Sequence, residues 1–231
     1  HVHQMPPGLS VAHILPGRGG TSLPGEPVNL GGEFGRTEWM DNGLVRVVFR
    51  ADGRFDIMDH STGRHIVGAG RLEDSEDAGD SYDWSAGGHP VPQAEGRGSK
   101  MPERVLATDC RFLDADEANR QVYLTIEQDD DWTATVRLHI AWALPARFDD
   151  ATQKRSEDLE WNTIDHYITL RSGHAMVEVE TWVNNACEDH RLRLHIPTDV
   201  KSKKVHAGGA FDIIQRPAKW PHHPKWEQPH V

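Results

Sequence analysis

The stretch that most constrains the fold is residues 163–197, where apolar and polar side chains alternate with a period of two through three successive runs. The runs cover residues 164–170, 176–183 and 190–196, separated by Ser172-Gly173 and by an asparagine pair. Alternation of this kind is typical of half-buried strands, and glycine and asparagine are typical of the turns between them. We therefore expect a three-stranded antiparallel meander.

The second and third runs of this meander can be aligned with each other. If Val183 lies opposite His190, then Val179 faces Leu194 and Val177 faces Ile196 on one side of the pair. On the other side Glu180 faces Arg193. A shift by one residue would bury the charges. An exposed Glu–Arg pair contributes well under about 1 kcal/mol, so the apolar face is expected to drive the pairing. His166 and His190 fall on inward faces, where a hydrogen-bonded core histidine is expected.

Strand patterns recur along most of the chain, and no segment shows the apolar stripe of an amphipathic helix. The clearest run, residues 135–144, sets Val, Leu, Ile, Trp and Leu against Thr, Arg and His, while Ala51-Asp52-Gly53 indicates a hairpin turn. We predict an all-β fold, a large antiparallel β-sandwich. The other predicted strands lie at residues 39–50, 55–57, 104–112, 122–127 and 211–214, and residues 147–160 are expected to form an exposed polar excursion.

Charge and composition exclude several classes of function. The net charge of −11 argues against a nucleic-acid partner, because binding phosphates needs a basic surface. No apolar run is long enough to cross a bilayer, and no signal peptide is recognisable. The first residue is His1, so we interpret the chain as an excised or processed piece. Cys110 and Cys187 are expected to be reduced, core-facing thiols, which favours a cytoplasmic location.

Residues 72–98 are acidic, rich in glycine and without periodicity, and a segment of this length is usually functional or mobile. Carboxylates beside aromatic rings suit sugar binding, because they accept hydrogen bonds from hydroxyls while a ring covers the apolar face of a pyranose. The sequence alone favours the alternative, a solvated loop whose aromatic residues pack inward. Carboxylate spacing does not fit a calcium-binding EF-hand. The residues concerned are Glu73, Asp74, Glu76, Asp77, Asp80 and Asp83, around Tyr82 and Trp84.

Histidine pairs near the two ends of the chain, His1 with His3 and His222 with His223, raise the question of a zinc site. Neither pair has a cysteine or carboxylate at the spacing that zinc sites use. We therefore expect no metal site in this chain. A glycosidase also needs two carboxylates on opposite sides of the scissile bond, and no such pair can be nominated from the sequence.

Four motifs resemble segments of one family, the bacterial α-mannosidases of glycoside hydrolase family 38. The sequence G-D-S-Y-D-W-S at residues 79–85 resembles the family's G-D-x-Y-x-x-S loop. H-R-L-R-L-H-I-P at residues 190–197 is similar to its H-R-L-R…P strand, and F-D-I-I-Q-R-P at residues 211–217 to its F-D-[VI]-[VI]-x-R-P segment. N-G-L-V-R-V at residues 42–47 resembles its opening hairpin. Single matches of this length are weak, but four in order are fairly specific.

The resemblance implies a β-sandwich similar to the galactose-mutarotase supersandwich, which follows a catalytic barrel in these enzymes. It places the zinc ligands, the aspartate nucleophile and the acid/base carboxylate in that barrel, so no catalytic residue and no metal are expected here. It also implies that Tyr82 reaches the sugar site, with Asp80, Asp83 and Trp84 as neighbours in a substrate-binding loop. A tyrosine pKa near 10 suits hydrogen bonding better than proton transfer. Where the family usually has proline after the loop serine, this chain has Ala86-Gly87.

The prediction is thus the non-catalytic C-terminal domain of a zinc-dependent retaining α-mannosidase, with an α-mannoside as substrate and the N-terminal barrel of the same polypeptide as partner. Its expected parts are a linker with an edge strand (1–32), the sandwich (33–217) and a truncated tail (218–231). Two alternatives remain: a carbohydrate-binding module that uses Tyr82 and Trp84 as a platform, and an aldose-epimerase-like enzyme with a histidine and a carboxylate facing each other in a groove. Fold-level likeness does not decide among them.

Overall fold

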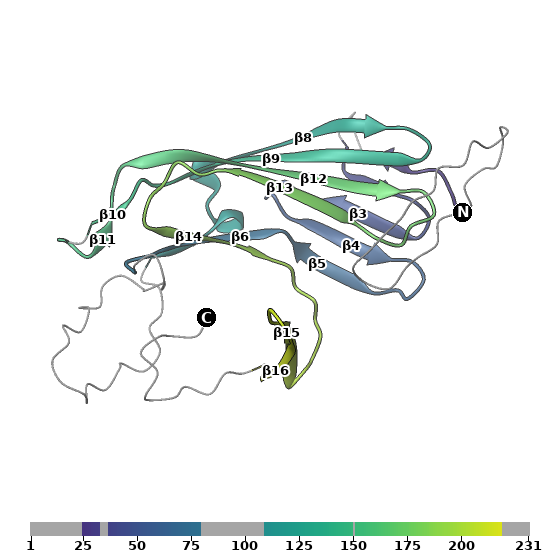
Figure 1. Ribbon diagram of the computed structural model, residues 1–231. Coiled ribbons are helices and arrows are strands. Elements are labelled where there is room, and N and C mark those ends of the chain that lie inside the picture. Colours follow the sequence, from purple (N-terminus) through teal and green to yellow (C-terminus); the bar gives the residue numbers. More distant parts are fainter. Residues whose placement is uncertain (1–24, 33–36, 80–108, 150, 219–231) are drawn as a thin grey trace.

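Two layers of antiparallel strands pack face to face in the computed structural model, which describes residues 25–32, 37–79, 109–149 and 151–218 (Figure 1). The helical content of these residues is two short 3-10 turns, Leu113–Ala115 and Glu117–Asn119. The predicted all-β antiparallel sandwich is therefore confirmed.

One layer is a four-stranded sheet in the order β13-β12-β9-β8. Its strands are β8 (Arg120–Asp129), β9 (Thr133–Pro145), β12 (Leu159–Arg171) and β13 (Glu178–Asn184). The alternation expected for residues 135–144 is present in β9 from Ala134 to Trp142, where every second residue is buried and those between are half-buried. The last three residues of the strand, 143–145, are all buried.

The other layer begins with a five-stranded sheet whose strands follow each other in chain order. The turn between β3 and β4 is the hairpin predicted at residues 51–53, and Gly53 has a φ of +86°, which favours glycine. Its strands are β1 (Asn29–Gly31), β2 (Trp39–Asp41), β3 (Val45–Phe49), β4 (Phe55–Asp59) and β5 (His65–Ala69).

A three-stranded sheet in the order β14-β6-β7 extends this second layer. It contains β6 (Arg71–Glu76), β7 (Cys110–Phe112) and β14 (His190–His195). Gly70 links β5 to β6, and its N–H donates to the carbonyl of His195 at 3.0 Å, which continues the hydrogen bonding of β14.

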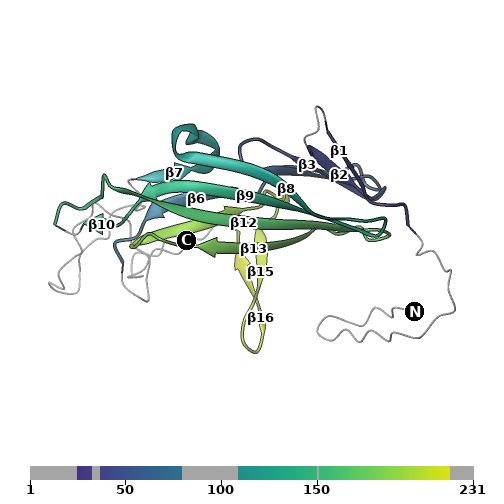
Figure 2. The same cartoon turned by 90° about the horizontal axis from the view of Figure 1, so that it is seen from above.

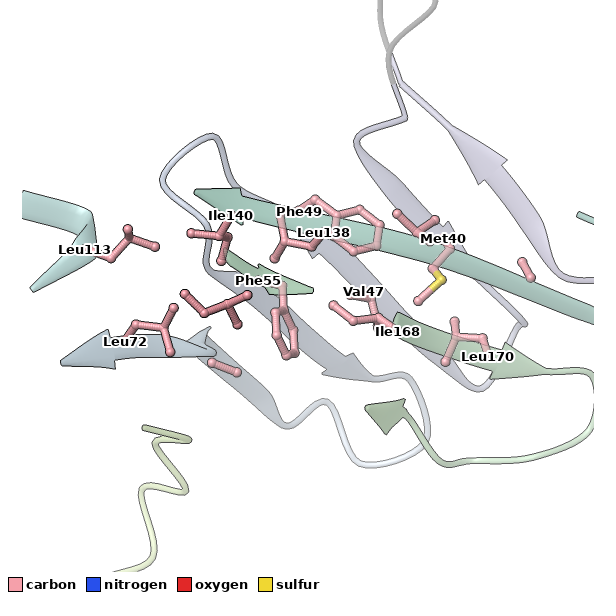
Figure 3. Close-up of a cluster of buried hydrophobic side chains, with 14 of the residues drawn as sticks. Met40, Val47, Phe49, Phe55, Leu72, Leu113, Leu138, Ile140, Ile168 and Leu170 are labelled. Carbon is pink, nitrogen blue, oxygen red and sulfur yellow. The ribbon is translucent and has the colours of Figure 1, made fainter. Parts of the chain in front are cut away.

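Apolar side chains from both layers meet between them (Figure 3). Val47 and Phe55 come from one layer, and Leu138 and Ile168 come from the other, all of them buried. Trp142 is also fully buried, and its indole N–H donates to Asp116 at 3.0 Å, so the buried polar atom is satisfied. Burial of this alternating face is the main force that holds the layers together.

The predicted meander is wrong in one respect, because β14 does not pair with β13. The connection after Asn184 carries the chain from one layer to the other, where β14 pairs with β6 (Figure 1). Arg193 therefore meets Glu73 and not Glu180. Leu192 packs against the core as the alternation predicted, but Leu194 on the same face is 41% exposed. A period of two is equally compatible with either neighbour.

Two further expectations need correction. The polar stretch 147–160 contains a small hairpin, β10 (Phe148–Asp149) with β11 (Lys154–Arg155), and it buries Phe148. Cys110 and Cys187 are both free thiols, but Cys187 is buried as expected while Cys110 is exposed. Residues 104–108 of one predicted strand lie outside the described residues.

The last described element is a hairpin of β15 (Lys204–Gly208) and β16 (Ile213–Pro217). Within the described residues its two strands pair with each other and with no strand of either layer, and the hairpin projects from the sandwich (Figures 1 and 2). Nearly all of its residues are exposed, including Ile213 and Ile214.

Candidate functional site

The residues predicted to bind sugar, Asp80, Tyr82, Asp83 and Trp84, lie outside the described residues. The structure does describe the chain on either side of them. Strand β6 leads up to residue 79, and residue 109 leads into β7, which pairs with β6. The candidate site therefore comprises the described strands on either side of this segment, β6 and β7, and the residues that contact them.

The carboxylates of β6 form a buried acidic row instead of the first part of a solvated loop. Glu73, Asp74 and Glu76 are all buried, so the expectation of a solvated segment is wrong for these three residues. The reason is that β6 is a central strand, with β14 on one side and β7 on the other. Basic side chains of β14 and β11 supply the opposite charge that a buried carboxylate requires.

On the inner side of β6, Asp74 lies between an arginine and a histidine. One oxygen accepts a hydrogen bond from Arg155 of β11, and the other lies 2.6 Å from Nδ1 of His190 on β14. The Nε2 atom of His190 is 2.8 Å from the side-chain oxygen of Asn185. All three ionisable side chains are almost fully buried, with exposed fractions of 0% for Asp74, 2% for Arg155 and 4% for His190.

On the outer side of β6, Glu73 is bound by Arg193 and lies 2.8 Å from Nε2 of His195. Burial alone would raise the pKa of Glu73, but the hydrogen bond and charge of Arg193 and the charge of His195 outweigh it, so the pKa is lowered. Desolvation and the negative charge of Glu73 raise the pKa of the Cys110 thiol to about 11. Cys110 is therefore protonated near neutral pH and is a poor nucleophile.

Three backbone contacts hold the chain next to this row. The N–H of Asp77 donates to the carbonyl of Asp189 at 2.9 Å, and the N–H of Gly79 donates to the Asp77 carboxylate at 2.9 Å. On the returning side, the N–H of Asp109 donates to Oε2 of Glu76 at 2.8 Å. One flank of residues 80–108 is thus fixed to the residue that precedes β14, and the other flank to β6.

Chemically, the carboxylates of this row are already engaged by partners within the domain. A glycosidase acid or nucleophile must be free to meet the substrate, whereas Glu73 and Asp74 are held by cations and Glu76 by a backbone N–H. In the described ranges, no group of three or more His, Cys, Asp or Glu residues could hold a metal ion. His166 is a core histidine, as expected: Thr181 lies 2.8 Å from its Nδ1, and burial lowers its pKa to about 4.

A cavity of about 380 Å³ lies beside the outer side of β6 and β14. Its polar lining comes from Arg54, Arg71 and His195. Both arginines already pair with Asp114, at 3.3 and 2.8 Å. Glu73, the carboxylate partner of His195, is not among the lining residues, so the cavity does not present the facing histidine and carboxylate that an epimerase would need.

The comparison with known sequences then identifies the domain. A sequence model of the glycosyl hydrolases family 38 C-terminal domain matches residues 40–231. This chain belongs to that family. A putative mannosylglycerate hydrolase from Halalkalibacterium halodurans is 23% identical over 204 residues, and the alignment covers 82% of this chain and 20% of that protein.

Two solved structures share the fold of this family 38 domain. One is an alpha-mannosidase from Enterococcus faecalis V583, with a TM-score of 0.61 and 19% identity over 79% of this chain and 20% of that one. The other is a glycosyl hydrolase family 38 protein from Enterococcus faecalis, with a TM-score of 0.61 and 20% identity over 78% of this chain and 21% of that one. The chain spans about one fifth of the length of these relatives.

The family 38 domain leaves one side of its sandwich open. By register, Val179 and Val183 of β13 point the same way as Ile168 and Ile164 of β12, which are buried. Nevertheless Val179 is 37% exposed and Val183 is 47% exposed at this edge of the sheet. Trp182, on the other face of β13, is 64% exposed.

Sequence reasoning missed the ionic partners of β6, although a signal was present. Arg191, Arg193 and His195 alternate along β14, and an acidic run of similar length occupies residues 73–77. Complementary charge could have matched these strands to each other. Arg155 carried no signal of its own, since it sits in a charged stretch that resembles any surface loop.

Proposed function

We propose that this chain is the C-terminal supporting domain of a retaining, zinc-dependent glycoside hydrolase that acts on α-mannosides. The observation that carries the proposal is the family match over residues 40–231, together with buried β6 carboxylates that are all engaged within the domain. The relatives named as an alpha-mannosidase and a mannosylglycerate hydrolase support the substrate class. The described residues do not fit a zinc site, so the proposal assigns the metal to the catalytic part of the polypeptide.

Within this proposal, Tyr82 contacts the sugar from the segment between β6 and β7, with Asp80, Asp83 and Trp84 beside it. Its phenol donates and accepts hydrogen bonds, and its ring excludes water from one side of the substrate. The paired strands that flank the segment are a rigid base, which suits a residue that must be held in place.

The proposed partner surface is the open side of the sandwich. The edge strand β13 and the projecting β15–β16 hairpin expose apolar residues that a monomeric domain rarely leaves in water, among them Trp182, Val183 and Ile213. We assign this surface to contact with the catalytic part of the same polypeptide, since four fifths of the length of the relatives lies outside the matched region.

Two assays test the proposal. The 231-residue chain is incubated with an aryl α-mannoside and added zinc, and no turnover above a buffer blank is expected. Turnover would place the chemistry in this domain. In the complete enzyme, Tyr82→Phe is expected to lower kcat/KM about tenfold or more, corresponding to the loss of a substrate hydrogen bond. Tyr123→Phe on the exposed face of β8 is the matched control, and equal effects of the two changes would refute the role of Tyr82.

A further inference from the structure

The buried ion cluster of Asp74, Arg155 and His190 is costly for stability. An arginine, a histidine and a carboxylate are removed from water, and buried groups of this kind are often no more stabilising than apolar residues of the same shape. Such a cluster does fix the orientation of its side chains, because each hydrogen bond constrains an angle as well as a distance. The position of the cluster in the fold therefore indicates which part of the chain it holds in place.

The hydrogen-bond partners of His190 specify its orientation. The side-chain oxygen of Asn185 accepts from the backbone N–H of Cys187 at 3.2 Å, so this oxygen, and not the amide nitrogen, faces Nε2 of His190. On the other side of the ring, Nδ1 faces a carboxylate oxygen of Asp74. Both contacts are donated at once only when both ring nitrogens carry protons. The ring of His190 thus joins β6 to the connection between β13 and β14.

The cluster lies next to both flanks of residues 80–108. Asp74 is three residues before Asp77, whose N–H donates to the carbonyl of Asp189, the neighbour of His190. Asp189 has a φ of +53°, a left-handed conformation that is uncommon outside glycine and must be held by its surroundings. Glu76, two residues after Asp74, accepts the N–H of Asp109 on the returning side.

We propose that Asp74, Arg155 and His190 form an ionic clamp that positions residues 77 and 109, and thereby sets where the chain leaves β6 and returns to β7. The consequence for sugar binding rests on the proposed function: in that case His190 is a positioning residue for Tyr82, and it touches no substrate itself. The clamp proper depends only on contacts among the described residues.

Amide hydrogen exchange on the 231-residue chain tests the clamp. Two variants separate the two contacts of His190: His190→Asn keeps a donor near Asp74, and His190→Gln keeps a donor near Asn185. In His190→Gln we expect the amides of Asp77 and Asp109 to exchange about tenfold faster or more, relative to the β9 amides of the core. His190→Asn is expected to have a smaller effect. The matched control is His139→Asn, which removes a histidine 2.7 Å from Asp165 on the other layer.

Three results would overturn the clamp. One is unchanged exchange at Asp77 and Asp109 in His190→Gln. Another is an equal rise at these amides and throughout β9, which would mean general destabilisation. The third is an equal local rise in His139→Asn. Should His190→Gln fail to fold, Arg155→Lys, which keeps the charge but replaces the guanidinium that donates to Asp74, is expected to raise exchange at the same two amides, and unchanged exchange there would overturn the clamp.

Kinetics of the complete enzyme then separate the clamp from the proposed function. We expect His190→Gln to lower kcat/KM about as much as Tyr82→Phe, and the double variant to be no worse than either single change, because both act through one side chain. If Tyr82→Phe lowers kcat/KM while His190→Gln leaves it unchanged, the positioning role is refuted. If Tyr82→Phe itself has no effect, the proposed function fails, and the exchange experiment alone decides the clamp.

Discussion

At the scale of a single residue, Gly70 shows how closely the second layer is packed where β5 passes into β6. Its φ is +78°, and a Cβ atom there would lie 2.6 Å from the ring of Phe55. Gly63 has a similar φ of +67°, but a Cβ atom would have nothing within 4 Å. The two glycines therefore share the backbone requirement and differ only in packing.

This contrast predicts the outcome of two alanine substitutions. Gly63→Ala should lower the free energy of unfolding by about 1–2 kcal/mol, the cost of a left-handed conformation. Gly70→Ala should lower it by about 1–3 kcal/mol more, because the methyl group displaces a core ring. Urea denaturation of both variants gives the comparison, and equal losses would show that the ring of Phe55 yields freely.

His166 predicts how stability depends on pH. Burial holds its pKa at about 4 in the folded state, against 6.5 for the free side chain, and the negative charge of Asp165 opposes this only in part. The unfolded chain therefore binds the proton first as pH falls. Stability is fully present above pH 6.5 and declines toward pH 4, with a slope on the order of 1 kcal/mol per pH unit.

The substitution His166→Asn should remove this part of the pH dependence, since asparagine can keep the contact with Thr181 and does not titrate. Unfolding free energies measured from pH 7 to pH 4 in the two proteins give the comparison. The paired carboxylates Glu73 and Asp56 have lowered pKa values and contribute at lower pH, below their ordinary values of 4.5 and 3.8. An unchanged slope in the variant would exclude His166 as its source.

At the scale of elements, the edge strand β13 predicts self-association of the isolated domain. Its outer backbone groups are unpaired within the described sheets, and Val183 is exposed on the side that continues the core. Natural edge strands often carry an inward-facing charge that blocks such pairing. Val183→Lys should therefore lower the association constant about tenfold or more, as measured by sedimentation at several concentrations. Thr125→Lys, on the opposite edge strand β8, adds the same charge and should have little effect.

The extent to which the sequence predicts these elements depends on what each strand faces. β9 and β12 alternate because water lies on one side and the core on the other, so their burial could be read directly. The burial of β6 could not be read from the sequence, because both faces of this strand are covered and its R-L-E-D-S-E sequence resembles a surface loop. The strand that pairs with β14 could not be predicted either, because its pairing with β6 depends on charged residues that are far apart in the sequence, such as Arg193 and Glu73. The predicted sugar-binding residues, centred on Tyr82, remain a prediction.

At the scale of the whole molecule, the β15–β16 hairpin is the part of the domain least able to stand alone. Two-stranded hairpins are marginally stable in water unless they pack against something, and this one exposes Phe211, Ile213 and Ile214. F-D-I-I-Q-R-P, the motif that begins at Phe211, is also one of the segments that resemble family 38. Under the proposed function, the apolar residues of this hairpin contact the rest of the polypeptide.

This expectation is tested by comparing the isolated domain with the complete enzyme. In the isolated domain the amides of β15 and β16 should exchange nearly as fast as unstructured peptide, whereas in the complete enzyme they should be slowed about tenfold or more. Ile213→Ser should shift the unfolding free energy of the isolated domain by no more than about 0.5 kcal/mol, since its side chain is already in water. In the complete enzyme the same change should cost more than about 1 kcal/mol, because it places a hydroxyl in an apolar contact. Equal costs in the two proteins would mean that the hairpin faces solvent in both.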